Sequence, residues 1–107
     1  MNREELAWAG GFFSGEGSFT KNGNGKLYPR IHIGQSFSPE SLIRVQKALG
    51  LGQINGPYLS PKGERNVYQL SINGFEQVQA AAAMMWPWLS TDKQEKAREV
   101  LLRTRGV

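Results

Sequence analysis

The run Asn22-Gly23-Asn24-Gly25 constrains the fold of this chain more than any other short segment. Asn and Gly tolerate the positive φ angles of tight turns, and the stretches on either side, residues 18–22 and 26–37, favour strands. Along residues 26–37, apolar side chains alternate with polar or basic ones, so one face of the predicted strand is apolar and the other is polar. The segment therefore predicts an antiparallel hairpin with one face turned toward a core.

A second hairpin and four helices are predicted around this hairpin. Ser38-Pro39-Glu40 begins a helix, with Ser38 as its N-cap, and Gly50 ends it. Pro87 ends the third helix, and Thr91 or Asp92 caps the fourth. The predicted helices span residues 3–14, 38–50, about 74–86 and 92–103, and the second pair of strands spans 53–59 and 65–72.

The predicted element order is α-β-β-α-β-β-α-α, which is an α+β fold. Two hairpins with helices between them imply a four-stranded antiparallel sheet with helices packed on one face. The other face is then left to solvent or to a ligand. A chain of 107 residues has room for a single core, so residues 1–107 are expected to form one domain.

Composition excludes several kinds of site. The chain has no Cys and one His, which excludes disulfides, zinc–thiolate sites, a cysteine nucleophile and a histidine-rich metal cage. Any metal would therefore be a hard cation held by oxygen ligands. No stretch approaches the roughly 18 uninterrupted apolar residues of a membrane span, so we expect no membrane partner and an intracellular, cytoplasmic location.

The charge of the chain is +4, from 13 Lys and Arg against 9 Asp and Glu, and the acids are unevenly spread. No acid lies in residues 17–39, and only one lies in residues 41–75. Both intervals contain predicted strands. One interpretation is a basic sheet face that meets the phosphates of a nucleic acid; the other is chance spacing of the charged residues.

Residues 6–19, LAWAGGFFSGEGSF, resemble the signature of the LAGLIDADG homing endonucleases, with the nine-residue motif at 9–17. The segment shares the helix of small and apolar residues, the Gly-acid-Gly at its end and the direct passage into a strand. It departs from the usual pattern at Ala9, where Leu is usual, in its Phe-Phe pair, and at Ser14, which replaces a common Asp. The acid is Glu16 rather than Asp. The order of predicted elements is similar to that of the family over essentially the whole chain.

The resemblance implies a homodimeric, site-specific double-strand DNA endonuclease that uses Mg²⁺ and acts on a long pseudo-palindromic site. In the family, the motif acid and nearby carbonyls hold the metals, which implies Glu16 and Gly15 as metal ligands. The resemblance also implies Gln35 as the residue that positions the attacking water, and Lys93, with Lys96 as a competing choice, as the active-site lysine. Each residue also has an interpretation without catalysis. Glu16 could be a solvated acid in a turn, Gln35 an amide at the end of a strand, and Lys93 a surface lysine at the start of a helix.

Small residues in the first helix allow a second helix to approach closely. Because the chain carries one motif, the resemblance implies that the second acid comes from a second copy. Close packing within the chain or a frayed helix are the alternative explanations of Gly10 and Gly11. The residues expected at the dimer interface are Ala7, Trp8, Ala9, Gly10 and Phe13.

On the fold that the resemblance implies, the free face of the sheet is a DNA-binding saddle, because a two-stranded ribbon fits the major groove. Arg30 is the candidate for a bidentate contact with guanine. Basic residues near the turns are expected at phosphates: Lys21, Lys26, Lys62 and Arg65. The other expected contacts lie on the polar sides of the hairpins: Ser18, Thr20, Asn22, Tyr28, His32, Asn55 (or its neighbour Gln53), Val67, Gln69 and Ser71.

Two other functions remain open from the sequence. The first is a nucleic-acid binder without catalysis on the same fold, such as an intron maturase or a DNA-binding regulator. The second is half of a two-motif or engineered endonuclease. If the chain is encoded by an organelle intron, the expected location becomes the organellar matrix.

Overall fold

The computed structural model describes residues 2–22, 27–63 and 65–104, with residue 22 through its backbone alone. Its elements follow the predicted order, with a short 3-10 helix, η1, added before the last helix. The elements are α1 (Arg3–Glu16), β1 (Gly17–Asn22), β2 (Tyr28–Ser36), α2 (Glu40–Leu49), β3 (Gln53–Leu59), β4 (Asn66–Asn73), α3 (Phe75–Met85), η1 (Trp86–Trp88) and α4 (Thr91–Thr104).

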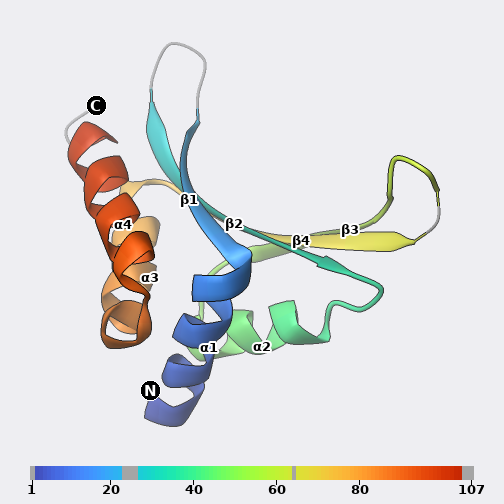
Figure 1. Cartoon of the computed structure of the whole chain (residues 1–107), viewed down its shortest axis with the longest axis horizontal. Coiled ribbons are helices and arrows are strands. Elements are labelled where there is room, and N and C mark those ends of the chain that lie inside the picture. Colours follow the sequence, from blue (N-terminus) through green and yellow to red (C-terminus); the bar gives the residue numbers. More distant parts are fainter. Residues whose placement is uncertain (1, 23–26, 64, 105–107) are drawn as a thin grey trace.

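The four strands form one antiparallel sheet in the order β1-β2-β4-β3, which confirms the predicted α+β fold. β1 and β2 pair from Gly17↔Ile33 to Asn22↔Tyr28, while the predicted turn at 23–25 and Lys26 lie outside the described residues. Figure 1 shows the helices gathered on one side of the sheet and the two hairpins diverging as arms. The side between the arms carries no described helix, and we call it the open face.

Helix α1 is capped at its start by a side chain and passes directly into β1 at its end. Asn2 caps its start by accepting a hydrogen bond from the Glu5 N–H at 3.1 Å. The helix continues two residues past the predicted end at 14, and the Gly17 N–H donates to the Phe13 carbonyl. A Cβ at Gly17 would collide with the Phe13 ring, so the chain can turn into the strand here only because this residue is glycine.

Serine hydroxyls accept hydrogen bonds at the start of two other helices. The N-cap of α2 is Pro39, one residue after the predicted Ser38, although the Ser38 hydroxyl still accepts from the Glu40 N–H at 3.2 Å. Gly50 ends α2 as predicted, with a left-handed φ of 68°. For α4 the predicted caps are corrected: Ser90, not Thr91 or Asp92, accepts a hydrogen bond, from the Lys93 N–H at 3.3 Å. The N-cap of α4 therefore lies in the short segment between η1 and α4.

The core lies between the helices and the covered face of the sheet. The buried rings of Phe13 and Phe19 meet edge to face, with centroids 4.8 Å apart. Along β2, Pro29, Ile31 and Ile33 are buried and the residues between them are partly exposed, which confirms the predicted alternation. Among the helices of residues 2–104 that the structure describes, none is long and apolar enough to cross a membrane.

Candidate nucleic-acid interface and catalytic residues

Glu16 is the last residue of α1 and lies exposed where the helix passes into β1. The last turn of α1 holds no basic residue, and within the described part of the chain no ion pair includes Glu16. A carboxylate at a helix C-terminus meets the negative end of the helix dipole, which costs roughly 0.3–1 kcal/mol. The Gly15 carbonyl is one of the last in the helix, which have no partner within it. Oxygen ligands and negative potential therefore gather at this helix end, which favours a cation.

Lys93 lies partly buried in the first turn of α4, where a cation meets the positive end of the helix dipole. Its competitor Lys96 already pairs with Glu99 on the same helix, with Nζ and Oε2 3.6 Å apart. None of the ion pairs found among the described residues includes Lys93. Of the two candidate lysines, Lys93 is the one left free for a substrate.

Ser14 joins the end of α1 to the start of α4. Its hydroxyl donates to the Gly10 carbonyl at 2.8 Å and accepts from the Ser90 N–H at 2.9 Å. Glu16 is two residues beyond Ser14, and Lys93 is three residues beyond Ser90, so this contact joins the helix ends that carry the two residues. Sequence reasoning missed this role of Ser14, although its departure from the motif Asp was the signal that could have found it.

Gln35 lies near the same end of the sheet. β2 pairs Ile33 with Gly17, the first residue of β1, and Gln35 lies two residues further along β2, beyond the end of that pairing. Strand alternation places Gln35 with Ile33 on the side of the helices, and its side chain is partly buried. Gln35 stays a candidate for positioning a water near Glu16, from the helix side of the sheet rather than from the open face.

The first hairpin turns a row of polar side chains toward the open face. Burial alternates along β1 and β2, so the polar residues are partly or fully exposed and the apolar residues between them are buried. This confirms which side of the hairpin each residue occupies, while contact with DNA stays a prediction. The predicted contact residues on this face are Ser18, Thr20, Tyr28, Arg30 and His32.

Lys21 and Ser71 do not have the surroundings predicted for them. Lys21 lies on the helix side of β1, with its Nζ 3.7 Å from Glu99 Oε1, because strand alternation places it opposite Thr20. Ser71 is only 7% exposed, and its hydroxyl accepts a hydrogen bond from Arg30 Nη2 at 2.9 Å. These surroundings do not favour the expected phosphate contact of Lys21 or the expected direct DNA contact of Ser71, and both stay predictions.

The second hairpin contributes further polar residues. Asn55 and Gln69 are register partners in β3 and β4, and both are partly buried. Beyond a register shift between Asn55 and Tyr58, Val67 pairs with Tyr58. Near the turn, the side chains of Lys62 and Arg65 are exposed, as a phosphate contact requires. The side chain of Asn22 and all of Lys26, two other predicted contacts, lie outside the described residues.

The dimer contact predicted on α1 is divided between two faces of the helix. Ala9 and Phe13 are fully buried in the core. Gly10 packs on η1, where an added Cβ would lie 2.8 Å from the Trp88 Cβ. The assignment of these three residues to a dimer interface is corrected, because contacts within the chain already cover them.

The opposite face of α1 is open. An added Cβ at Gly11 or Gly15 would meet no described atom within 4 Å. Glycine in a helix interior costs about 1 kcal/mol relative to alanine, and no contact among the described residues accounts for glycine at these positions. In the sequence, the spacing of four residues between Gly11 and Gly15 indicates that both lie on this one face of the helix. We call it the α1 strip; at helical spacings of three and four it comprises Glu4, Ala7, Trp8, Gly11 and Gly15.

One edge of the α1 strip is held by α2. Arg44 donates two hydrogen bonds to the Glu5 carboxylate, at 2.8 and 2.9 Å, and its guanidinium lies 4.0 Å from the centre of the Trp8 ring. The hydrogen bonds from Arg44 lower the pKa of the Glu5 carboxyl, against a smaller opposing effect of desolvation. Trp8 also stacks on Phe12, with ring centroids 5.1 Å apart, so its own chain fixes its position.

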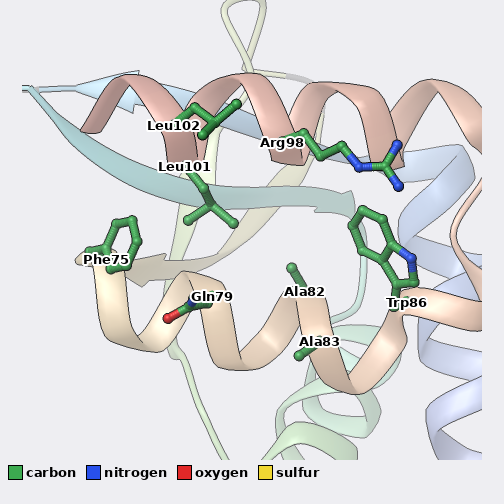
Figure 2. A pocket seen from close by; sticks show the side chains of 8 residues that line it. All are labelled: Phe75, Gln79, Ala82, Ala83, Trp86, Arg98, Leu101 and Leu102. Atoms are coloured by element: carbon green, nitrogen blue, oxygen red, sulfur yellow. The ribbon is translucent and has the colours of Figure 1, made fainter. Parts of the chain in front are cut away.

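One cavity lies away from these residues. It is a groove of about 950 Å³ between α3 and α4, and Figure 2 shows Ala82 and Leu101 among the apolar side chains that line it. Its only charged lining residue among those described is Arg98, whose guanidinium lies 4.9 Å from the Trp86 ring centre. None of the predicted catalytic residues lies in its described lining.

Among the comparisons with known proteins, only those with solved structures find matches to this chain. No protein-family model and no curated protein matches the chain. The homing endonuclease I-CvuI, solved with an uncleaved DNA target and Mg, is 19% identical with a TM-score of 0.76, over 97% of this chain and 69% of that one. The homing endonuclease I-TnaI is 20% identical with a TM-score of 0.72, over 99% of this chain and 76% of that one.

A third similar structure is matched over a smaller part of its own length. The LAGLIDADG meganuclease I-CpaMI, solved with uncleaved DNA, is 23% identical with a TM-score of 0.65, over 88% of this chain and 34% of that one. At such identities the likeness concerns architecture. It confirms that this chain has the fold of the LAGLIDADG homing endonucleases.

Proposed function

We propose that the chain is a member of the LAGLIDADG homing endonucleases and that, as a homodimer, it cuts both strands of a specific DNA site with the help of divalent cations. One observation carries the proposal: the unpaired carboxylate of Glu16 stands at the exposed end of α1, beside a strip of glycines that no described part of the chain covers. The structural neighbours bound to DNA support the same function.

The α1 strip supports the homodimer. Two copies of α1 that pack through Gly11 and Gly15 can approach backbone to backbone, because neither residue carries a side chain. A two-fold axis through this contact brings the two helix ends together, each with one Glu16. A two-fold protein then favours a pseudo-palindromic DNA site.

The donor set fits a hard divalent cation such as Mg²⁺. The described part of one chain contains no group of three or more potential His, Cys, Asp or Glu ligands. Mg²⁺ usually keeps several waters and binds through one or two carboxylates plus substrate phosphates. Glu16 and the Gly15 carbonyl from each copy, together with the DNA backbone, are such a set. When bound, the cation activates water and stabilises the leaving oxygen.

The remaining candidates act on the substrate directly. To Lys93, in the first turn of α4, we assign the stabilisation of the charge that develops on the phosphate. Gln35 orients the attacking water through its amide. The open face holds the duplex, with Lys62 and Arg65 at phosphates.

Cleavage of a library of randomised two-fold symmetric DNA duplexes with Mg²⁺ tests the proposal. We expect staggered cuts at one family of sites, lost when EDTA removes the metal. Glu16→Gln is expected to lower the cleavage rate by at least about 100-fold while DNA binding persists. Glu76→Gln, which changes an exposed acid in the first turn of α3, is the matched control and is expected to cleave like the parent protein.

Two results would contradict the proposal in different ways. Sequence-selective binding by the parent protein without cleavage, in Mg²⁺ or Mn²⁺, would exclude the nuclease and favour a DNA-binding protein on the same fold. Sedimentation of a monomer that stays monomeric on DNA would exclude the two-fold active site.

A further inference from the structure

Arg30 stands in the middle of the open face, and part of its guanidinium is already engaged. It lies on β2, level with Thr20 on β1 and Asn73 on β4. Its Nη2 donates to the Ser71 hydroxyl at 2.9 Å. Its Nε is buried and has no hydrogen-bond partner among the described residues. The inner edge of the guanidinium is therefore turned into the sheet.

The remaining donors define what Arg30 can recognise. A guanidinium has five N–H donors in a planar fork. With Nε buried and one Nη2 proton directed at Ser71, the free donors are the second Nη2 proton and both Nη1 protons. The terminal Nη1–Nη2 edge is thus the edge that Arg30 can present to a ligand. Two parallel donors match the O6 and N7 acceptors of guanine in the major groove.

Ser71 is suited to hold this arrangement. It lies on β4, with His32 of β2 and Gln53 of β3 as its register partners, so hydrogen-bonded strands flank it on both sides. The residue is only 7% exposed, which leaves little room for a base to reach its hydroxyl. Ser71 is fixed in place and acts on its surroundings chiefly through Arg30.

We propose that Ser71 is a positioning residue for base recognition, which holds the Arg30 guanidinium so that its terminal edge reads one guanine in each half of the DNA site. The inference rests on the proposed function. An arginine fixed before binding loses less conformational entropy when it binds. Without the Ser71 hydroxyl, Arg30 keeps its charge and its attraction to DNA, so discrimination between bases falls more than overall affinity.

The test is a double-mutant cycle read out as base preference. The parent protein, Ser71→Ala, Arg30→Ala and the double variant are each bound to a random-sequence duplex library in EDTA, and the bound DNA is sequenced. Arg30→Ala is expected to lose a guanine preference of about 5- to 100-fold at one position per half-site. Ser71→Ala is expected to lower the preference at the same position by about 3- to 10-fold. In the Arg30→Ala background, Ser71→Ala is expected to change nothing further.

Controls separate positioning from folding. Ser41→Ala, a matched serine deletion on α2, is expected to leave the preference unchanged, and Ser71→Thr, which keeps a hydroxyl, is expected to retain it. Thermal unfolding checks each variant. If Ser71→Ala does not fold, Ser71→Cys takes its place and is expected to lower the preference at the same position, because a thiol is a weak hydrogen-bond acceptor. Equal effects of Ser71→Ala in both backgrounds, loss of preference in Ser71→Thr despite normal folding, or a shifted preference elsewhere in the site would overturn the inference. Absence of any selective binding by the parent protein would instead refute the proposed function, and the inference with it.

Discussion

Gly10 and Gly11 are neighbours in the same helix, yet they are glycines for opposite reasons. At Gly10 an added Cβ would lie 2.8 Å from the Trp88 Cβ and 3.2 Å from the Met85 carbonyl oxygen. At Gly11 an added Cβ would meet no described atom within 4 Å. The first glycine lets the chain pack against itself. The second has no function within the described chain, and its cost to the helix is explained only if something outside approaches.

The contrast extends along the whole of α1. On one side Leu6, Ala9 and Phe13 are buried in the core. On the other side Gly11 and Gly15 are exposed. One amphipathic helix therefore serves two interfaces, one within the chain and one that we assign to a second copy. Substitutions on the two sides should separate folding from assembly.

Gly10→Ala is expected to give the largest change in stability. Overpacking a filled contact costs about 1–3 kcal/mol, and the better helix propensity of alanine returns about 1 kcal/mol. We expect the free energy of unfolding to fall by up to about 2 kcal/mol in urea titrations of the whole chain. An unchanged or higher stability would show that the contact with Trp88 can relax, and that the distinction between the two glycines is false.

Gly11→Ala is expected to act in the opposite sense. Nothing within the described chain obstructs the new methyl group, so the isolated protomer should gain about 0.5–1 kcal/mol of stability. The same methyl separates two packed α1 helices, and the dimer dissociation constant, measured by sedimentation, should rise by about 10-fold or more. Dimerisation as tight as in the parent protein would place the contact on another surface. Gly10→Ala is the natural control, because its side of α1 faces the core.

Ser14→Ala is expected to weaken the join between the core side of α1 and the start of α4. Loss of the hydrogen bonds to Gly10 and Ser90 should cost about 1 kcal/mol of stability. Because this join holds the end of α1 that carries Glu16 against the start of α4 that carries Lys93, we also expect a lower kcat with little change in DNA affinity. Ser14→Asp keeps an acceptor for the Ser90 N–H and should recover most of the rate. Equal losses in affinity and kcat would point to a general structural role.

Much of the fold follows from local signals. The Asn-Gly turn and the alternation around Ile31 and Ile33 lie within a few residues of one another, and both predict the hairpin that is observed. The cap of α4 was missed because Ser90, Thr91 and Asp92 are three consecutive good caps. What selects Ser90 is a contact with α1, far away in the chain.

The candidate site was less accessible from sequence. Small residues at helical spacing predicted a close approach on α1, but only the position of η1 shows that Gly10 faces inward and Gly11 outward. Lys21 could have been placed by alternation from Thr20, whereas its nearness to a turn suggested a phosphate contact. The bond from Arg30 to Ser71 has no sequence signal, because it joins strands that pair only in the folded sheet.

The smallest expected effect concerns the edge of the α1 strip, where Glu5 and Arg44 pair. Arg44 lowers the pKa of Glu5 in the folded chain, so the carboxylate contributes stability above its unfolded pKa, near 4.5. That contribution should be lost as the pH falls through the lower, folded pKa. Arg44 stays charged throughout this range, since Glu5 raises its pKa further.

Urea midpoints of the parent protein and of Glu5→Gln, measured from pH 6 to pH 3, isolate this pair. The difference between the two proteins should be largest above pH 5 and should shrink on acidification, and 0.5 M salt should reduce it because the pair is exposed to solvent. A constant difference would mean that Glu5 acts through packing rather than charge. In that case the pair does not fix Trp8 electrostatically, and the edge of the α1 strip is set by the stacking of Trp8 on Phe12.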